Sequence, residues 1–403
     1  MKTPWELLKE SKTKIKTTWR IAFVSALVLG LLIHLPVMLS DIPNHDGLGS
    51  MYFDQNMITS GRWFLTVACG FSSYFTIPWV IGLIGLIWLA LTAAVLTEVL
   101  ELKDPVTITV VSGLLVSFPA LASTFAYVFT MDGYMLALFL AVLAVLFTAK
   151  YPRGYLAGAV CLAFSMGIYQ AYLPFTILLC VYKILLFFME EKGWKEKAKY
   201  VCRYLGMGIA GGVLYYVILQ ILLKLQGKVL DTYQGINSME QMGSGLGILT
   251  TIRGMYVDFL AFTVHGNVLV NNIFSLAACI ILVATVVFLV IRSMIRRKWW
   301  KNPAFFVIMI LLGISMPLLT NVILLISPNL TYHLLMRYQW VLYLILMTAF
   351  ADRYTAEESC TDVALQWAAL CAAVVLVFNY GISDNIGYSN LEKKYEKTYA
   401  YCV

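Results

Sequence analysis

Long apolar runs alternate with short polar segments along the whole chain. A helix needs about 20 apolar residues to cross a hydrocarbon core that is roughly 30 Å thick. Runs of this kind occur eleven times, at residues 21–40, 77–98, 106–123, 133–149, 154–168, 172–189, 204–224, 271–291, 304–327, 334–351 and 363–380. The pattern therefore predicts an all-α polytopic membrane protein with about 11 transmembrane helices.

Composition agrees with this pattern. Hydrophobic residues make up 61% of the chain and charged residues 13%, whereas about a quarter of a soluble domain is charged. The first apolar run is too long for a removed signal peptide and lacks a small-residue cleavage site. The eight cysteines contain no CxxC pair, and the four histidines lack metal-ligand spacing. These cysteines are therefore interpreted as packing residues, and no metal site is expected.

Lysine and arginine are distributed unequally between the two sets of loops. If the N-terminus is cytoplasmic, twenty basic residues fall on inside segments and seven on outside segments. Positive residues accumulate on the cytoplasmic side of membrane proteins. The sequence therefore predicts a cytoplasmic N-terminus and an extracytoplasmic C-terminus. The formal net charge of +7 is explained by this topology and gives no reason to expect a nucleic-acid partner.

The chain is predicted to have three parts. Residues 1–20 form a cytoplasmic basic amphipathic segment, residues 21–380 the transmembrane domain, and residues 381–403 an extracytoplasmic tail that is expected to continue in the natural protein. Outer loops are predicted at residues 41–76, 124–132, 169–171, 225–270 and 328–333. The mixed stretch 248–270 is interrupted by charges, so it predicts an interfacial or re-entrant helix rather than a span.

Charged residues are nearly absent from the depth of the predicted spans, so chemistry is expected at the outer surface. The first outer loop carries Asp41, Asp46 and Asp54, followed by Arg62 and Trp63. A carboxylate at the mouth of an apolar bundle suits a general base. A guanidinium can bind phosphate through two hydrogen bonds, and Trp63 is expected at the headgroup level. Solvated loop charges are the alternative interpretation.

Later outer loops add a lone acid and several aromatic residues. Asp132 begins a span, where it could act chemically or cap the helix N-terminus. Tyr134, Tyr169, Gln170 and Tyr172 could line a sugar site, although tyrosine also gathers at membrane interfaces without a functional reason. Further along, His333 and Arg337 are spaced one helical turn apart, which predicts that they share one face of a helix.

Five loop segments resemble those of the bacterial Gtr-type membrane glucosyltransferases, members of the GT-C superfamily. They are NHDGL (44–48), GRW (61–63), FPALASTFAYVFTMDGY (118–134), GIYQAYLPF (167–175) and YQGIN (233–237). The resemblance extends in matching order from about residue 20 to 400. It implies the GT-C architecture with an outward-facing active site. It also implies a polyprenyl-phosphate-linked sugar, usually glucose, as the donor, and O-antigen or a related surface polymer as the acceptor.

The resemblance also implies roles for individual residues. An acid in the first outer loop is the expected base. Asp46 fits that place, but the segment Asn44-His45-Asp46 lacks the paired acids of other members, so Asp41 and Asp54 remain alternatives. Asp132 is the second expected catalytic residue. The residues expected to bind the donor phosphate are Arg62, Arg253 and Arg337. Those expected to bind the sugar or acceptor are Asp54, Tyr134, Tyr169, Gln170, Tyr172, Gln234, Asn237 and His333.

These expectations define one enzymatic reaction and one alternative class of protein. The enzyme would move a hexose to a surface polysaccharide or teichoic-type polymer with inversion, at the outer face of a bacterial cytoplasmic membrane. Its arginines would neutralise the leaving phosphate without a metal or other cofactor. The rival is a flippase or transporter for a lipid-linked sugar. That class would need polar residues through the membrane depth, and these are missing.

Overall fold

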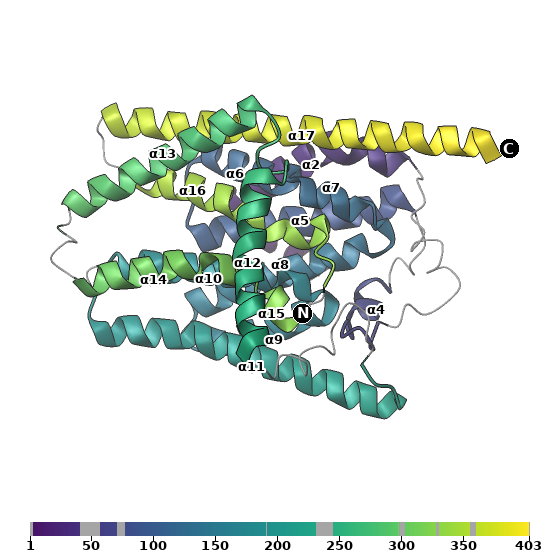
Figure 1. Ribbon diagram of the computed structural model, residues 1–403, viewed down its shortest axis with the longest axis horizontal. Helices are drawn as coiled ribbons and strands as arrows, with labels where there is room; N and C mark the ends of the chain where they lie inside the picture. The colour runs from purple at the N-terminus through teal and green to yellow at the C-terminus, as the bar shows by residue number, and fades with distance from the viewer. Residues whose placement is uncertain are drawn as a thin grey trace.

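The computed structural model describes residues 3–40, 57–70, 77–190, 192–230, 245–296, 298, 303–327, 330–354 and 360–402. Within these ranges every regular element is a helix (Figure 1). The helices are α1 (Pro4–Lys14), α2 (Thr17–Leu39), α4 (Leu65–Ala68), α5 (Pro78–Leu100), α6 (Pro105–Ser117), α7 (Pro119–Phe125), η1 (Val128–Thr130), α8 (Met131–Lys150), α9 (Gly154–Ile168), η2 (Gln170–Tyr172), α10 (Leu173–Phe188), α11 (Trp194–Gln226), α12 (Gly245–His265), α13 (Ile273–Arg296), α14 (Pro303–Thr320), α15 (Ile323–Ile326), η5 (Leu334–Trp340), α16 (Val341–Tyr354) and α17 (Cys360–Cys402).

Each of the eleven predicted apolar runs coincides with a helix or a pair of helices. Among the described residues, nine helices are long and apolar enough to cross a membrane, or ten if the bent pair α6 and α7 forms one span. The number differs from eleven because α9 and the described apolar part of α14 are shorter, whereas α12 meets the same criteria. The described residues thus confirm an all-α protein with several membrane-spanning helices, nine or ten by length and composition where the sequence predicted about eleven.

The polar segments predicted to face the cytoplasm meet at one end of the bundle. Glu98 accepts hydrogen bonds from the Nζ atoms of Lys16, at 2.7 Å, and Lys150, at 2.8 Å. Lys183 Nζ lies 2.6 Å from Glu101. Burial alone would raise the pKa of Glu101, but the hydrogen bond and charge of Lys183 hold it below its ordinary value. These contacts join the segments around residues 16, 98, 150 and 183.

Helix breaks occur towards the opposite end. Phe118 is extended between α6 and α7, whose axes differ by 47°. It precedes Pro119, and a residue before proline is disfavoured in the helical conformation. Tyr169 is likewise extended between α9 and η2. The breaks free backbone groups and side chains from continuous helices, and they lie where the candidate site is found.

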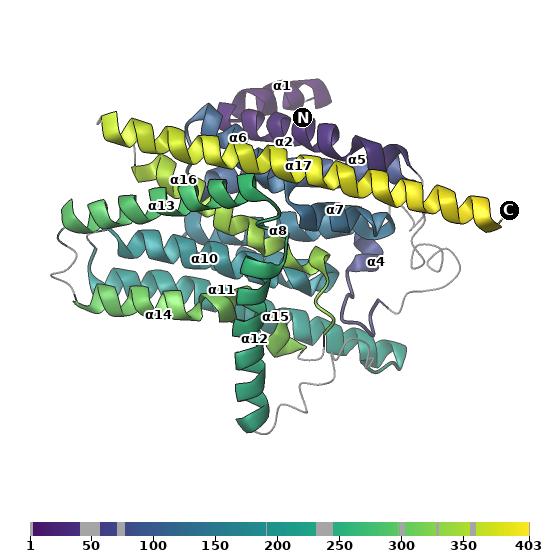
Figure 2. The same cartoon turned by 45° about the horizontal axis from the view of Figure 1, so that its top comes forward.

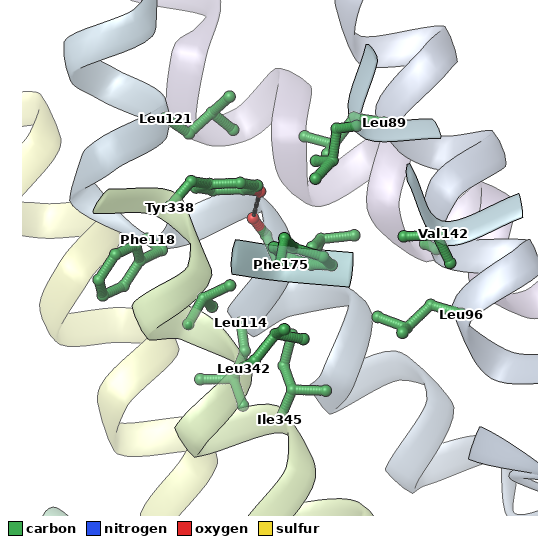
Figure 3. Packing of buried hydrophobic residues seen from close by; sticks show 14 of the residues in the cluster. Leu89, Leu96, Leu114, Phe118, Leu121, Val142, Phe175, Tyr338, Leu342 and Ile345 are labelled. Carbon is green, nitrogen blue, oxygen red and sulfur yellow. Dashed lines mark hydrogen bonds between the residues drawn. The ribbon is translucent and has the colours of Figure 1, made fainter. Parts of the chain in front are cut away.

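The central core is built from the helices that carry these breaks. Phe118, Phe175 and Tyr338 converge on it from three different segments, and the Tyr338 hydroxyl donates to the Leu115 carbonyl (Figure 3). In the most apolar stretch of Val128–Lys150, which comprises η1 and α8, 78% of the residues are buried, as they are in Leu334–Tyr354, which comprises η5 and α16. The corresponding share in α11 is only 17%. The broken helices are therefore enclosed by protein, and α11 contributes mostly exposed apolar surface, as expected for a helix at the lipid boundary.

Helix α12 lies across the other helices, close to perpendicular to them in both views (Figures 1 and 2). Only 11% of the residues in its most apolar stretch are buried. Length and composition alone would allow it to cross a membrane. Its direction instead fits the interfacial or re-entrant helix predicted for residues 248–270.

Helix α17 is longer than a membrane is thick. It has 43 residues, so it is about 65 Å long, and its C-terminal end extends past the neighbouring helices (Figure 1). It continues without a break through residue 381, where the tail was predicted to begin. There it packs on α2: Asn385 Nδ2 donates to the Ile33 carbonyl at 3.1 Å, and Tyr388 Oη lies 2.7 Å from His34 Nδ1.

Candidate active site

Arg62, the first of the three predicted phosphate-binding arginines, ends a tight turn at residues 57–62. Arg62 N–H donates to the Met57 carbonyl at 2.7 Å, and Gly61 N–H donates to the Ile58 carbonyl at 3.0 Å. This pair of bonds, with Gly61 at a φ of 77°, is the Schellman motif that ends many helices. The left-handed conformation favours glycine because it has no Cβ. The GRW sequence thus encodes a turn from which the Arg62 side chain leaves.

Two segments distant in sequence hold this turn. Tyr215 Oη, on α11, donates to the Gly61 carbonyl at 3.0 Å. Gln170 Nε2, on η2, donates to Tyr215 Oη at 2.9 Å and to the Ser60 carbonyl at 3.4 Å. A Cβ at position 61 would lie 2.6 Å from Tyr215 Oη and 2.7 Å from Gln170 Nε2. Glycine is therefore required by space as well as by conformation.

Arg62 extends towards a pair of stacked tyrosines. Its Nη1 lies 3.4 Å from Tyr134 Oη, and its Cζ lies 5.3 Å from the centroid of the Tyr169 ring. The two rings are 4.2 Å apart and inclined by 14°, and Tyr172 meets Tyr169 edge-on at 5.4 Å. A cation over an aromatic face is favourable. The structure thus brings together the predicted residues Arg62, Tyr134, Tyr169 and Tyr172.

Asp132 lies in the first turn of α8, two residues before Tyr134, and is 2% exposed. Its Oδ1 accepts the Gly133 N–H at 2.9 Å. The N-cap position belongs to Thr130, so Asp132 serves the helix terminus from within the first turn. Burial raises the pKa of the Cys69 thiol well above its ordinary value, and the adjacent Asp132 carboxylate adds to this rise. A buried carboxylate and thiol therefore join α4 to the start of α8.

The broken helices also give this region a favourable field for anions. Both α8 and α10 begin here, at Met131 and Leu173, and η2 packs against both α8 and η5. A helix N-terminus carries partial positive charge. Together with the Arg62 guanidinium, these termini suit a negatively charged group, while the tyrosine rings offer apolar faces with polar edges.

Arg337 lies in a second polar cluster, where it binds a carboxylate. Its Nη1 and Nη2 each lie 2.7 Å from an oxygen of Asp258 on α12. Its Cζ also lies 3.9 Å from the Tyr332 ring centroid and 4.7 Å from that of Phe262. Asn321 Nδ2 donates to the same carboxylate at 3.1 Å. This cluster fastens the transverse helix to the bundle.

The prediction that His333 and Arg337 share one helix face is wrong. His333 is an extended, exposed residue that precedes η5. Arg337 has non-helical φ and ψ angles of −104° and 22° and is 9% exposed. A one-turn spacing aligns two residues only if both belong to the same regular helix.

Trp63, which the sequence places at the headgroup level, is enclosed by protein. It is 8% exposed. It packs against Phe164 and Leu219, and a Cβ at Gly167 would lie 2.6 Å from its indole ring. The absent side chain at Gly167 opens the space between α9 and α11 that the indole fills.

The remaining predicted residues fall into two groups. Arg253 is exposed on α12. The others, Asp41, Asp46, Asp54, Gln234 and Asn237, lie outside the described residues. Within the part of the chain that the structure describes, no group of three or more His, Cys, Asp or Glu residues could hold a metal ion.

Sequence reasoning missed Tyr215. It lies inside the predicted span 204–224, where a tyrosine reads as one more bulky apolar residue. A buried tyrosine hydroxyl usually needs a hydrogen-bond partner, and this was the available signal. The partner is the backbone of residue 61, which no local pattern could identify.

Fold and site together define a membrane protein in which an arginine and stacked tyrosines lie among broken helices. The sequence matches the family Glucosyl transferase GtrII over residues 35–351, more than three-quarters of the chain. The protein therefore belongs to this glucosyltransferase family, as its loop segments predicted. The matched region contains both arginine clusters and ends before α17. No curated protein sequence and no solved structure matches the chain.

Proposed function

We propose that this protein transfers a hexose, expected to be glucose, from a polyprenyl-phosphate donor to a cell-surface glycan. The observation that carries the proposal is the placement of Arg62 over the Tyr134–Tyr169 stack, beside the N-terminus of α8. In a glucosyltransferase with many apolar helices, such a site suits a lipid-linked donor that carries a phosphate. The donor's lipid would remain in the bilayer while its sugar and phosphate reach the site.

The proposed reaction is a single displacement with inversion. Asp46, from the loop that precedes the Gly61 turn, accepts the proton of the acceptor hydroxyl. The acceptor oxygen attacks the anomeric carbon, and the bond from that carbon to the phosphate oxygen breaks. Arg62 stabilises the negative charge that develops on the departing polyprenyl phosphate. Asp132, two residues before Tyr134, is the second carboxylate assigned to the reaction.

Arg62 is proposed as the principal phosphate ligand, with Arg253 and Arg337 as further contacts. Arg253 is exposed, whereas Arg337 would have to exchange Asp258 for phosphate. Tyr134, Tyr169 and Tyr172 are assigned to the sugar by their ring faces. The remaining sugar and acceptor assignments are Asp54, Gln170, Gln234, Asn237 and His333.

The proposed location is a bacterial cytoplasmic membrane, with the N-terminus inside and the active site facing outward. The acceptor is proposed to be a surface polysaccharide or a teichoic-type polymer. Support comes from the distribution of lysine and arginine. It also comes from the ion pairs that gather the proposed inside segments at one end of the bundle, away from Arg62.

A transfer assay tests the proposal. The purified protein is reconstituted in vesicles with polyprenyl-phosphate [¹⁴C]glucose and envelope polymer from a strain that lacks the gene. We expect radioactivity to move into the polymer and free polyprenyl phosphate to appear in equal amount. Movement of the labelled lipid between leaflets without transfer to polymer would instead identify a flippase and contradict the proposal.

A further inference from the structure

The hydroxyl group of Tyr215 makes two hydrogen bonds to segments far away in sequence. It donates to the Gly61 carbonyl at 3.0 Å and accepts from Gln170 Nε2 at 2.9 Å. Its ring also lies 6.5 Å from that of Trp63. The residue therefore ties α11 and η2 to the turn that ends at Arg62.

The bond to Gly61 acts directly on the peptide group that precedes the Arg62 Cα. That peptide is held on both sides, because its N–H donates to the Met57 carbonyl at 2.7 Å and its C=O accepts from Tyr215. A peptide group is planar and rigid. Two hydrogen bonds on opposite edges therefore fix its plane, and with it the direction in which the Arg62 side chain leaves the turn.

We infer that Tyr215 is a positioning residue that directs the Arg62 guanidinium towards the Tyr134–Tyr169 stack. The inference rests on the proposed function as far as turnover is concerned, since Arg62 is the group that would meet the donor phosphate. In this role Tyr215 acts through the Gly61 turn and not as a ligand of the substrate. It sets the geometry of the cation, and a small misplacement of a positioned group can greatly reduce a reaction rate.

The chain offers a matched control next to this residue. Tyr215→Phe removes only the hydroxyl and keeps the ring that packs near Trp63. Tyr216 follows on the same helix, about 100° further round its axis, and is 58% exposed. Tyr216→Phe therefore removes the same atom from the same helix without touching the Gly61 turn.

The first experiment does not depend on enzymatic activity. Phenylglyoxal condenses with guanidinium groups, and its reaction at Arg62 can be followed by peptide mass spectrometry of the full-length protein in detergent. We expect Arg62 in Tyr215→Phe to react about 2- to 10-fold faster than in the wild type, the factor that one neutral hydrogen bond provides. Tyr216→Phe should react at the wild-type rate. Equal rates for Tyr215→Phe and the wild type would overturn the inference.

A second variant guards against misfolding of the first. Gln170→Met removes the hydrogen bonds to Tyr215 and the Ser60 carbonyl while keeping a similar volume. It should also accelerate modification of Arg62, provided that its unfolding temperature stays near that of the wild type. A stable Gln170→Met protein with unchanged labelling would contradict the inference even if Tyr215→Phe could not be purified.

The second experiment measures turnover in a double-mutant cycle. Tyr215→Phe should lower kcat per folded enzyme with little change in the KM for the acceptor. In an Arg62→Ala background the same change should have no further effect, because no guanidinium is left to direct. Effects that multiply would refute positioning through Arg62. A wild type that transfers no sugar would refute the proposed function and leave the labelling result standing.

Discussion

Two arginines of this protein have different surroundings, and these surroundings suit them to different roles. Arg337 places its planar fork on the Asp258 carboxylate. Its Cζ also lies close to the centroids of two aromatic rings, at 3.9 Å from Tyr332 and 4.7 Å from Phe262. Arg62 reaches a tyrosine hydroxyl and a tyrosine ring, away from the ion pairs of Glu98 and Glu101. The first arrangement is suited to joining two helices. The second leaves the cation beside polar and aromatic groups, where we propose that the sugar phosphate binds.

Replacing Arg62 by lysine separates phosphate binding from simple anchoring. Lysine keeps the charge but loses the planar fork, so an anchoring role would survive the change. We expect transfer to fall by roughly 10²-fold, the cost of removing one donor to a developing oxyanion, with an unchanged unfolding temperature. The measurement is initial transfer rate per folded enzyme. Near-normal transfer would exclude Arg62 and leave Arg253 or Arg337 as the phosphate ligand.

Asp46→Asn tests the proposed base. The substitution preserves size and polarity but removes the proton acceptor, so transfer should fall by about 10²–10⁴-fold, while binding of the lipid donor is retained. Asp41→Asn and Asp54→Asn are the matched controls from the same loop, and they should cost much less. If Asp54→Asn alone abolished turnover, the role of base would pass from Asp46 to Asp54.

At the scale of elements, the transverse helix α12 packs over one of the helix breaks. Phe118, Tyr169 and Arg337 all have backbone angles that interrupt regular helices. Helix α12 covers the break at Arg337: the Phe259 and Phe262 rings lie 4.7 and 4.8 Å from that of Trp340. An interrupted helix exposes backbone polar groups that apolar surroundings cannot satisfy. A covering helix keeps this break out of the lipid.

Replacing the Arg337–Asp258 ion pair by two uncharged residues tests whether it attaches α12 to the bundle. Arg337→Met leaves Asp258 without its partner and should destabilise the protein by about 3 kcal/mol, the low end of the range for breaking a buried ion pair. The low end applies because the Asp258 side chain is 27% exposed. Adding Asp258→Leu should recover most of that loss in thermal unfolding. If both proteins were as stable as the wild type but failed to bind donor, Arg337 would be a phosphate ligand.

At the scale of the whole molecule, the two ends of the bundle differ in chemistry. One end is held by ion pairs, including Lys16 and Lys150 with Glu98 and Lys183 with Glu101. The other end contains Arg62, the stacked tyrosines and the buried Asp132. If positive residues mark the cytoplasmic side, as is usual, the site faces outward, where a surface polymer would be available.

Reporter fusions test this orientation. A reporter joined after residue 198, near the start of α11, should be cytoplasmic, and one joined at residue 240 should be external. Alkaline phosphatase and a fluorescent protein provide opposite signals for the two sides. A cytoplasmic signal at residue 240 would contradict the proposed topology, and the closely spaced pair α9 and α10 would be the first place to look for the error.

Much of the candidate site was predictable, because its residues lie in loops or at span ends that the sequence assigns to one side of the membrane. Arg62, Tyr134 and Tyr169 were each expected at the same membrane face, and the structure places them in contact. The partner of Arg337 was not predictable. Asp258 is 79 residues earlier in the chain, on a helix whose direction depends on packing against the rest of the bundle.

The sequence by itself determined the class of this protein, its apolar helices and its family. Those properties follow from contiguous apolar runs and from short loop segments, which are local in the chain, because crossing a hydrocarbon layer constrains each run separately. Only the tertiary structure decided where Asp132, Trp63 and His333 lie. It also brought Tyr215 to Gly61, across 154 residues. Such contacts depend on how whole helices pack, and a run of apolar residues does not encode which neighbour each face will meet.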